Sequence, residues 1–585
     1  MQSAHELLTR WPALDVGAKR ARLNNSLHLS PGLAEAVAGS TGTAERAARG
    51  LWQADPSAWT ADAAAQKDIA DRLGWLRSPM LMADSLDRLE TFAASIKRNG
   101  FTDVVLLGMG GSSLAPEVLR AVIGIADGWP RLHMLDSTDP AAVRAAATAP
   151  DRTLYLLSSK SGTTIEPNSL AAHFRQRLQD AGIPRWADHF IAITDEGTEL
   201  DRRARSERFR EVFINPSDIG GRYSALSFFG MVPAALMGQD VGEIIGWALA
   251  MLAASEPGGT AAVANPAVSL GLVMGAAALD GRDKMTLVVP PALDAFGLWV
   301  EQLIAESTGK NGKGIVPIAG EPMADAAAYG IDRLFVRVRG HGAPGEEARE
   351  GRLRALAAAQ APIVEIDMPV TQALGAEFMR WEIATAVAGA ILAIDPFDQP
   401  NVQQAKDATN VLLASYKDSG ALPVAKADQT VGGVTFTLSA AAREPLQSQG
   451  EALLSLLHGG DYFALLAYLG PDPALLAELQ RLRIAVRDRA RVATMFGYGP
   501  RYLHSTGQLH KGGPNSGVFV LISATPVEDV SIPGQAFSFG TLEQAQVNGD
   551  FNSLDAAGRR AVHIHLPSPD PAQLRKVADA LLASI

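Results

Sequence analysis

No cysteine occurs in the 585 residues, which excludes disulfide bonds, thiolate nucleophiles and zinc sites built from cysteine. Without disulfides, a reducing cytoplasmic location is expected. The N-terminus also lacks the basic start and the continuous apolar run of a signal peptide. Long apolar runs are absent as well, because the most membrane-like window, residues 261–279, is interrupted by Asn265 and Pro266. We interpret that window as a buried helix and expect no membrane association.

Positive charge is scarce relative to negative charge, and the net charge of −11 gives the chain no general attraction to polyanions. Nucleic acid is therefore not an expected partner, and any phosphate site must be local. Apolar residues make up 47% and aromatic residues 6% of the chain, a composition that disfavours disorder and coiled coils. At about 150 residues per domain, the length predicts three or four domains.

The order of apolar segments predicts an α/β protein. Residues 1–95 carry helical spacing and no strand run, so they are expected to form an N-terminal helical segment. From Val104 onward, short apolar runs alternate with helix-length stretches, which predicts parallel sheets covered by helices on both faces. The expected strands are 104–107, 132–135, 154–157, 190–193 and 212–214 in a first sheet, and 286–289, 315–318, 334–338 and 363–366 in a second.

A third α/β unit is expected near the C-terminus, with strands at 434–438, 518–522 and 562–566 and helices at 452–457 and 473–484. The predicted organisation is a helical segment at 1–95, two doubly wound α/β domains at 96–255 and 256–425, and an additional C-terminal α/β domain at 426–585. In such sheets, ligands bind beyond the carboxyl ends of the strands. The glycine-rich and serine-rich loops of this chain fall at those ends.

The densest polar loop, Ser-Ser-Lys-Ser-Gly-Thr-Thr at 158–164, follows a predicted strand and precedes a helix. Its hydroxyl groups, the charge of Lys160 and the unpaired N–H groups of a helix start can together satisfy the oxygens of a phosphate. Gly162 permits close approach of the backbone. An ordinary capped turn is the alternative, because serine and threonine favour such positions anyway.

A second loop of this kind, Gly-Met-Gly-Gly-Ser-Ser at 108–113, follows the strand at 104–107. It departs from the dinucleotide fingerprint Gly-x-Gly-x-x-Gly, because Ser113 stands in the place of the third glycine. Asp136 nevertheless falls about where a ribose ligand is expected, so a nicotinamide cofactor stays open as an alternative at this point. Two donor-rich loops at one sheet edge can also converge on a single phosphate.

Two charged residues complete the candidate site. Gly220 and Gly221 precede Arg222, and this turn can present the guanidinium group toward a ligand. Glu306 falls in the last turn of a predicted helix, where the negative end of the helix dipole disfavours the ionised form, as suits a general base. An i,i+4 pair of Glu306 with Lys310 on a solvated face is the alternative.

Five stretches occur in an order that resembles the glucose-6-phosphate isomerase family. They are Gly-Met-Gly-Gly-Ser at 108–112, Ser-Lys-Ser-Gly-Thr-Thr-x-Glu at 159–166, Gly-Gly-Arg-Tyr-Ser at 220–224, Glu-Ser-x-Gly-Lys at 306–310 and Asp-Pro-Phe-Asp-Gln-Pro-x-Val-x-x-x-Lys at 395–406. The resemblance implies two SIS-type, flavodoxin-like αβα domains, commonly a homodimer, and neither a cofactor nor a metal. The C-terminal part is similar to that of fused transaldolase–glucose-6-phosphate isomerases.

The resemblance also implies a role for each motif residue. Glu306 would transfer the proton between C2 and C1, Arg222 would stabilise the enediolate, and Lys406 would lie near the ring oxygen. The residues implied to hold the substrate phosphate are Ser112, Ser159, Lys160, Ser161, Thr164 and Gln399. Phosphate binding would fix the remote end of the sugar and orient C1 and C2 against the base.

The histidine with which the family opens the sugar ring lacks its usual sequence context. His341 lies in a charged loop that we interpret as a solvated crossing. The glycine-rich stretch 497–515 contains the patterns that accompany the family histidine, so we predict that His510 opens the ring, with His504 as the alternative. His563 and His565 alternate along a strand, and a two-histidine metal site there is a remote alternative.

The predicted function is the reversible isomerisation of glucose 6-phosphate and fructose 6-phosphate. A broader isomerase that also accepts mannose 6-phosphate is one alternative. A SIS-type sensor that binds a phosphosugar without chemistry is another, but Glu306 and Arg222 argue against it, because binding alone needs neither.

Overall fold

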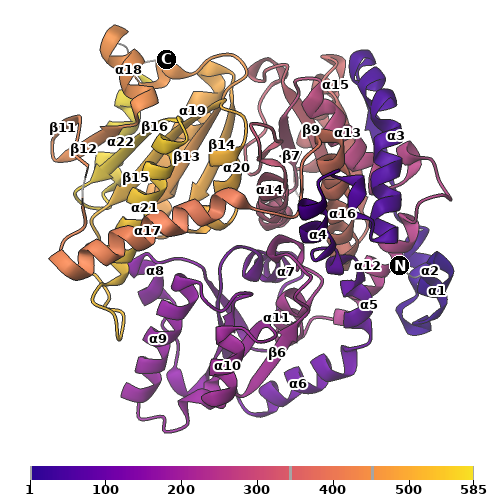
Figure 1. Cartoon of the computed structure of the whole chain (residues 1–585), viewed down its shortest axis with the longest axis horizontal. Helices are drawn as coiled ribbons and strands as arrows, with labels where there is room; N and C mark the ends of the chain where they lie inside the picture. The colour runs from indigo at the N-terminus through magenta and orange to yellow at the C-terminus, as the bar shows by residue number, and fades with distance from the viewer. Residues whose placement is uncertain (1–2, 341–344, 424, 450–452, 584–585) are drawn as a thin grey trace.

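Three parallel β-sheets organise the chain (Figure 1). The computed structural model describes residues 3–340, 345–423, 425–449 and 453–583. The first sheet contains β2 (Asp103–Leu107), β3 (Arg131–Leu135), β4 (Thr153–Ser158), β5 (Phe190–Asp195) and β6 (Glu211–Asn215) in the order β3-β2-β4-β5-β6. This is a doubly wound, flavodoxin-like order. All five predicted strands are confirmed, and β4 is buried along its whole length, as its apolar run predicts.

The second sheet repeats this order with one addition. It contains β7 (Lys284–Val288), β8 (Val316–Ile318), β9 (Arg333–Gly340) and β10 (Ile363–Met368), and β1 (Asn25–His28) pairs antiparallel with β10 at the edge. The prediction that residues 1–95 contain no strand is therefore wrong. Asn-Ser-Leu-His is too short and too polar to stand out by periodicity, and β1 is an edge strand whose pairing supplies what its own sequence does not.

The C-terminal unit is a third doubly wound sheet. Its parallel strands are β13 (Tyr462–Tyr468), β14 (Ala493–Tyr498), β15 (Gly517–Ala524) and β16 (Arg560–Leu566), and β12 (Val434–Leu438) and β11 (Gln429–Val431) extend it antiparallel. The sequence does not predict β14, which forms one edge of the sheet, or β13, which pairs with it on the inner side. The predicted helix at 452–457 is a short 3-10 turn, Leu453–Leu456, over the residues that the structure describes.

Helices cover these sheets and join them. The N-terminal segment contains α1 (Ala4–Thr9), α2 (Val16–Arg20), α3 (Pro31–Gln53), α4 (Ala63–Ala70), α5 (Ser78–Ala83) and α6 (Leu86–Arg98). The first sheet carries α7 (Leu114–Val122), α8 (Pro140–Ala145), α9 (Ile165–Asp180), α10 (Glu199–Ser206) and α11 (Phe228–Leu236), whereas α12 (Val241–Ala254) packs on α16 and α2. Around the second lie α13 (Val268–Leu279), α14 (Asp294–Thr308), α15 (Glu346–Ala358) and α16 (Leu374–Leu392). Around the third lie α17 (Pro400–Ser419), α18 (Ala440–Gln449), α19 (Pro473–Ala490), α20 (Gly507–Gly512), α21 (Phe539–Ala556) and α22 (Pro571–Leu582).

The helix α17 runs from the second sheet to the third and packs along α21 (Figure 1). Leu412 and Leu413 of α17 also belong to a buried cluster that contains residues of the first unit. Within the described ranges, no helix combines the length and the apolarity that a membrane crossing requires. The exact domain boundaries stay predictions.

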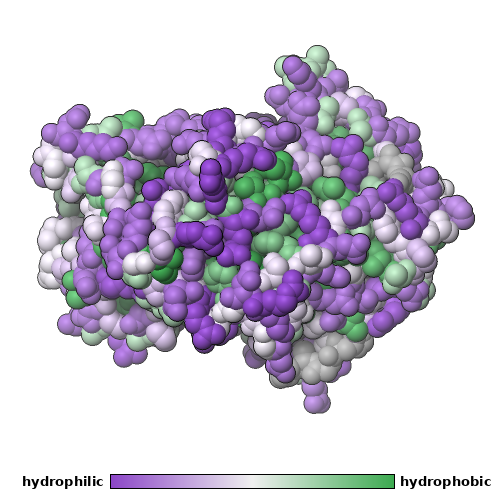
Figure 2. Space-filling model, turned by 90° about the horizontal axis from the view of Figure 1, so that it is seen from below, coloured by the Kyte–Doolittle hydropathy of each residue, from purple (hydrophilic) through white to green (hydrophobic). Residues whose placement is uncertain are grey.

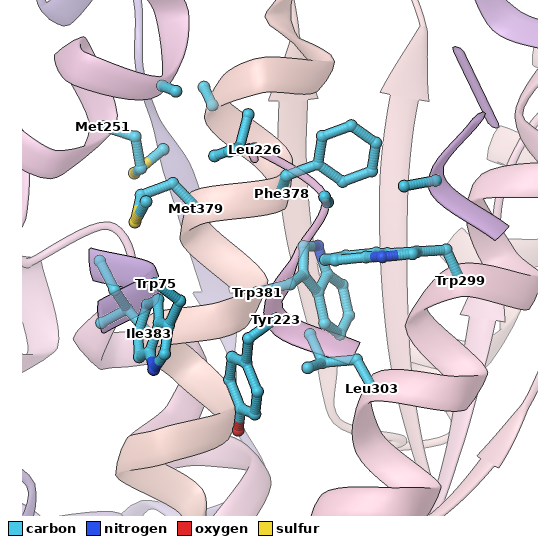
Figure 3. Close-up of a cluster of buried hydrophobic side chains, with 14 of the residues drawn as sticks. Trp75, Tyr223, Leu226, Met251, Trp299, Leu303, Phe378, Met379, Trp381 and Ile383 are labelled. Atoms are coloured by element: carbon cyan, nitrogen blue, oxygen red, sulfur yellow. The ribbon is translucent and has the colours of Figure 1, made fainter. Parts of the chain in front are cut away.

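An aromatic core around α16 supports the candidate site from behind (Figure 3). Tyr223 stacks on Trp75 with ring centroids 5.0 Å apart, and Trp299 meets Phe378 edge to face at 4.7 Å. Tyr223 directly follows Arg222, and Trp299 lies on α14 two turns before Glu306. Close packing of this core therefore fixes the backbone that carries both candidate catalytic residues.

The surface seen from below is largely hydrophilic, and its hydrophobic residues gather near the middle of that face among hydrophilic ones (Figure 2). Apolar atoms are normal on a protein surface. This face therefore gives no separate indication of a partner.

Candidate active site

The start of α9 forms an open anion site. Thr164 is the N-cap residue of this sixteen-residue helix, and its side chain makes no capping hydrogen bond. The N–H groups before Pro167, which itself has none, are therefore not capped by Thr164 and can meet an anion, and the helix dipole favours negative charge there. Thr163, Thr164 and Ile165 line a cavity of about 260 Å³. A phosphate in this cavity would meet the helix start directly.

The other hydroxyl groups of the turn hold its shape. Ser159 Oγ accepts a hydrogen bond from the Gly162 N–H at 3.2 Å and lies 3.4 Å from Thr164 Oγ1. The hydroxyl of Ser161 lies 3.1 Å from that of Thr163. In the preceding turn of the same sheet, the Ser112 carbonyl accepts from Ser158 Oγ at 3.2 Å. The two turns predicted to bind phosphate are thus adjacent.

The side chain of Lys160 is not directed toward these hydroxyl groups. Its Nζ pairs with Asp195 at the end of β5 and donates to the Ser217 carbonyl at 3.0 Å. Burial raises the pKa of Asp195, and the charge of Lys160 opposes that shift. The structure therefore uses Lys160 to join neighbouring strand ends, and its predicted contact with phosphate requires this pair to open.

Glycine is required where the loops meet. Gly110 has φ of +56°, and a Cβ on it would lie 2.6 Å from the His504 carbonyl oxygen and 2.9 Å from Gln302 Nε2. A Cβ on Gly111 would lie 2.0 Å from the Gly221 carbonyl oxygen. The turn at 108–113 therefore touches the Arg222 turn, α14 and the C-terminal unit at once.

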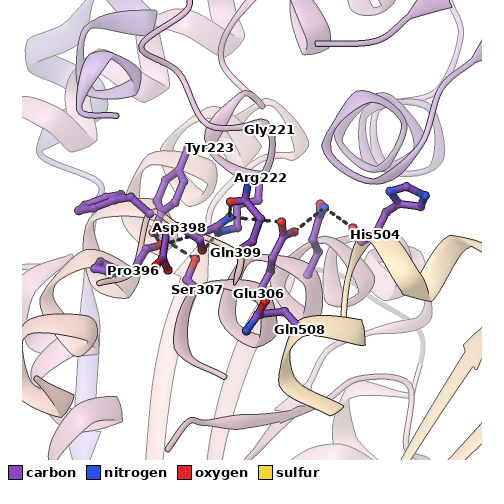
Figure 4. A network of polar contacts seen from close by, with 12 residues as sticks. Gly221, Arg222, Tyr223, Glu306, Ser307, Pro396, Asp398, Gln399, His504 and Gln508 are labelled. Carbon is purple, nitrogen blue, oxygen red and sulfur yellow. Dashed lines mark hydrogen bonds and ion pairs between the residues drawn. The ribbon is translucent and has the colours of Figure 1, made fainter. Parts of the chain in front are cut away.

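Arg222 uses all five of its N–H donors within the protein (Figure 4). It is 3% exposed. Its acceptors are Ser307 Oγ at 2.6 Å, Glu306 Oε1 at 3.3 Å, Gln399 Oε1 at 2.9 Å, the Pro396 carbonyl at 2.7 Å and the Asp398 carbonyl at 2.9 Å. In this state the guanidinium group positions Glu306 and the 395–399 turn. The predicted contact with an enediolate needs one of these acceptors, of which the exposed Gln399 side chain is the most easily displaced, to move.

Glu306 lies at the end of α14 with a side chain 12% exposed. It pairs with Arg222, and Gln302 Nε2 donates to its Oε2 at 3.2 Å. The same Gln302 nitrogen donates to the His504 carbonyl at 2.7 Å. The alternative pairing with Lys310 does not occur, because Lys310 contacts Asp398 instead.

Lys310 is 2% exposed and holds the turn before α17. Its Nζ contacts Asp398 Oδ1 and donates to the Asp395 carbonyl, both at 2.5 Å. Burial lowers the pKa of Lys310 to about 8, and the nearby Arg222 acts in the same direction. The 395–399 turn is therefore held by two buried cations, Lys310 and Arg222.

His504 reaches the cavity from the C-terminal unit. Its Nε2 lies 3.0 Å from Glu166 Oε1, and the same oxygen accepts from Gln546 Nε2 at 2.8 Å. Burial on its own would raise the pKa of Glu166, but His504 and Lys406 outweigh burial and hold it below its usual range. An ionised Glu166 accepts a hydrogen bond from the N–H of Nε2, which leaves the other ring nitrogen of His504 for proton transfer.

His510 lies elsewhere. It is 1% exposed, packs against Tyr502 and Phe519, and neither ring nitrogen has a hydrogen-bond partner among the described residues. Burial lowers its pKa well below the usual range, and Lys511 and Arg559 add to the shift. His510 does not line the cavity, whereas His504 does. The geometry therefore favours the alternative, His504, for ring opening.

The cavity brings together residues from all three sheets. Besides the start of α9, it is lined by Lys406 from α17 and by His504 and Gln546 from the C-terminal unit. Gln508 closes the same junction, because its Nε2 donates to the Gly309 carbonyl at 2.9 Å and to Asn401 Oδ1 at 2.7 Å. Gln399 is placed against Arg222 rather than among the hydroxyl groups.

Sequence reasoning gave no role to three of these residues. Glu166 stands inside a recognised motif, and Gln302 precedes Glu306 by one helical turn, so both carried a usable signal. Gln546 lies in the middle of α21, and nothing in its surroundings marks it. Its place in the site depends entirely on how α21 packs against the first unit.

The remaining alternatives find little support. Asp136 accepts from Ser113 Oγ at 3.1 Å and pairs with Arg501 Nε at 3.1 Å, so it does not face a ribose. His563 and His565 both contact the Ser523 hydroxyl. Within the described ranges, no group of three or more His, Asp or Glu side chains could hold a metal ion. His341 lies outside the described residues.

Comparisons with known proteins show similarity to glucose-6-phosphate isomerases, which are also called phosphoglucose isomerases. The family model for phosphoglucose isomerase matches residues 86–315. A glucose-6-phosphate isomerase of Parasynechococcus marenigrum (strain WH8102) is 30% identical over 437 residues, which cover 64% of this chain and 78% of that protein. One of Synechococcus sp. (strain JA-2-3B'a(2-13)) is 29% identical over 424 residues, 62% of this chain and 78% of that protein. The crystal structure of a hypothetical protein of Thermus thermophilus matches with a TM-score of 0.53 and 25% identity, covering 66% of this chain and all of that one.

Proposed function

The chain belongs to the glucose-6-phosphate isomerase family, and we propose that it catalyses the reversible isomerisation of D-glucose 6-phosphate and D-fructose 6-phosphate. This step moves a hydrogen between C1 and C2 of the open-chain sugar through an enediolate. It requires an anchored phosphate, a base beside C1 and C2, and a group that opens the sugar ring.

The proposal rests on one observation: the uncapped start of α9 lines a cavity, and Glu306, the proposed base, is connected by hydrogen bonds to another segment that lines the same cavity. Thr163 and Thr164 line the cavity at one end. Glu306 is joined through Gln302 to the His504 segment, which lines the same cavity. An anchored phosphate would therefore hold the reacting carbons near the base, and this positioning supplies much of the rate enhancement.

The proposed proton path uses residues of two units. Glu306 takes the proton from C2 and returns it to C1 while the hydroxyl proton of O2 passes to O1, and the Arg222 charge stabilises the oxygen that becomes negative. His504, held by Glu166, opens the ring together with Lys406, which lines the cavity beside it. The C-terminal unit is then part of the catalytic machinery, because it delivers His504.

A coupled assay tests the function. The purified chain is incubated with fructose 6-phosphate, and glucose 6-phosphate is followed through its dehydrogenase. Turnover at a rate typical of enzymes is expected, and a chelator should leave it unchanged if no metal takes part. Absence of turnover with an intact fold would reject the proposal and favour a phosphosugar sensor. The same assay with mannose 6-phosphate decides whether this epimer is also accepted.

We further propose a cytoplasmic homodimer, as the family resemblance implies, and the relation to fused transaldolase proteins stays a prediction. Light scattering coupled to gel filtration measures the mass directly. A mass of one chain, 61.7 kDa, at assay concentrations would reject the dimer without touching the proposed reaction, because His504 reaches the cavity within one chain.

A further inference from the structure

A second cavity lies where all three α/β units meet. Its volume is about 560 Å³, within the range of small-molecule sites. The first unit contributes α7, the second contributes the start of α14, and the third contributes α19 and residues 496–505. Its walls are mainly apolar, and they include Leu114, Leu298, Leu476 and Phe496.

The same elements separate this cavity from the active site. Leu298 and Glu301 of α14 face the second cavity, while Gln302 and Glu306 of that helix belong to the active site. The turn Arg501–His504 is shared in the same way, because Arg501 lines the second cavity and His504 lines the first. An occupant of the second cavity would therefore contact the two elements that carry Glu306 and His504, on the side away from the active site.

The side chain of Glu301 indicates that the cavity binds a ligand. It is 5% exposed, lines the cavity, and its Oε2 has no hydrogen-bond partner among the described residues. A buried polar atom without a partner is costly and uncommon. Burial raises the pKa of Glu301 to about 8, against the opposing charge of Arg483. Glu301 is therefore mostly an uncharged acid at neutral pH, with an O–H donor to offer.

Both cations that line the cavity are paired within the chain, whereas the carboxylate of Asp294, which also lines it, is exposed to solvent. Arg501 pairs with Glu117 and with Asp136. Arg483 donates to the Ala319 carbonyl at 2.8 Å and the Gly320 carbonyl at 3.0 Å, and to Thr494 at 2.7 and 3.2 Å. An anion would have to lose its hydration without gaining a free counter-charge, and a cation would gain only the solvent-exposed carboxylate of Asp294, so either ion is disfavoured inside the cavity. An uncharged ligand avoids that cost.

We propose that this cavity is a binding site for an uncharged small molecule, with an apolar or aromatic body and a carbonyl oxygen that accepts the hydrogen bond of Glu301. Its occupant changes turnover at the active site, because α14 and the 501–504 turn form the wall between them. This second part rests on the proposed isomerase function, whereas binding does not.

Three probes of one shape test the ligand class. Benzamide is uncharged and carries a carbonyl group, benzoate is an anion, and benzylamine is a cation. Binding to the full chain is measured by ligand-observed NMR or calorimetry. Benzamide should bind with a dissociation constant on the order of 1 mM, as suits about nine heavy atoms, and the two ions at least tenfold more weakly. Equal or tighter binding of either ion, or no binding of benzamide, would overturn the proposal.

Variants locate the site. Glu301→Gln keeps a neutral donor and should retain benzamide affinity within about threefold, while Glu301→Met, of similar size without a donor, should lose at least tenfold. Ala295→Phe fills the cavity from a half-exposed position and should abolish binding. Unchanged binding in both Glu301→Met and Ala295→Phe would place the ligand elsewhere and reject the site.

The coupling has its own measurement. Saturating benzamide should change kcat of the wild-type chain at least twofold and leave the Glu301→Met variant unaffected at the same concentration. Binding without a change in kcat would reject the coupling. Failure of the isomerase reaction itself leaves the binding result intact, because the binding measurements do not use turnover.

Discussion

Two carboxylates on α14 and two histidines in the stretch 497–515 show how surroundings divide similar residues into different roles. Glu306 is paired with Arg222 and Gln302, whereas Glu301, five residues earlier, leaves Oε2 without a partner among the described residues. His504 is held by Glu166 at the cavity, whereas His510 is enclosed by aromatic rings. In each pair, the residue with fixed polar partners faces the active site.

The largest effect is expected when the carboxylates are exchanged for amides. Glu306→Gln removes the proposed base and should lower kcat by about 10²–10⁴, while Glu301→Gln should stay within about threefold of wild type in kcat. Circular dichroism checks that both variants are folded. Near-normal turnover in Glu306→Gln, or an equal loss in both variants, would contradict the distinction between them.

The next largest effect is expected for the substitution of His504. His504→Asn should lower turnover of the cyclic sugar by about 10–10², because ring opening also proceeds slowly without a catalyst. An analogue that lacks the 4- and 5-hydroxyl groups and so stays open-chain should react at nearly the wild-type rate. His510→Phe serves as the matched control and should retain activity on both. A selective loss on the cyclic sugar in His510→Phe would restore His510 to the ring-opening role.

Glu166→Gln should have a smaller effect. The amide can still contact His504, but it removes the negative charge that holds the ring, and a charged hydrogen bond contributes about 1.5–3 kcal/mol. Turnover of the cyclic sugar should fall about tenfold while that of the open-chain analogue stays unchanged. A loss on both substrates would mean that Glu166 acts on the substrate and not through His504.

The smallest expected effect is on the pH dependence of the free energy of unfolding. His510, His173, His563 and His565 all have pKa values lowered mainly by burial. The unfolded chain takes up protons below about 6.5, the ordinary value, while the folded chain does not. The contribution of these histidines to the free energy of unfolding should therefore decrease as the pH falls from 7 to 5, whereas buried acids with a raised pKa, such as Glu301, contribute with the opposite sign.

His510→Phe should remove one proton's share of the histidine contribution, so the slope of unfolding free energy against pH between 7 and 5 should be lower than in the wild type by up to about 1.4 kcal/mol per pH unit. Urea unfolding at several pH values measures the slope. Leu509→Met, at the neighbouring buried position, is the control and should leave the slope unchanged. An unaltered slope in His510→Phe would mean that His510 takes up its proton in the folded state too.

Much of the fold could be predicted because its strands are continuous apolar runs. The nine strands of the first two parallel sheets are all found near their predicted positions. The strand β13 was missed although it is apolar throughout, because its flanks gave no clear turn signal, and β14 was missed because it merges with the glycine-rich stretch that follows. The strand β1 is defined by pairing with β10, which no local pattern reveals.

The candidate site was likewise only partly predictable from the sequence. Motifs identified Glu306, Arg222 and the turn at 158–164, because each needs residue types that local sequence displays. The direction of Lys160 toward Asp195 depends on contacts between strands, as does the choice between His504 and His510. Gln546 could not be found at all, because only the packing of the third unit on the first brings it to Glu166.

The central claim is that Glu306 transfers a hydrogen between neighbouring carbons of a sugar whose phosphate is held at the start of α9. Incubation of fructose 6-phosphate with the chain in deuterated water, followed by NMR, tests this claim most directly. We predict glucose 6-phosphate with deuterium at C2 for the wild type and neither product nor exchange above background for Glu306→Gln. Deuterium incorporation at the same rate in both proteins would contradict the account.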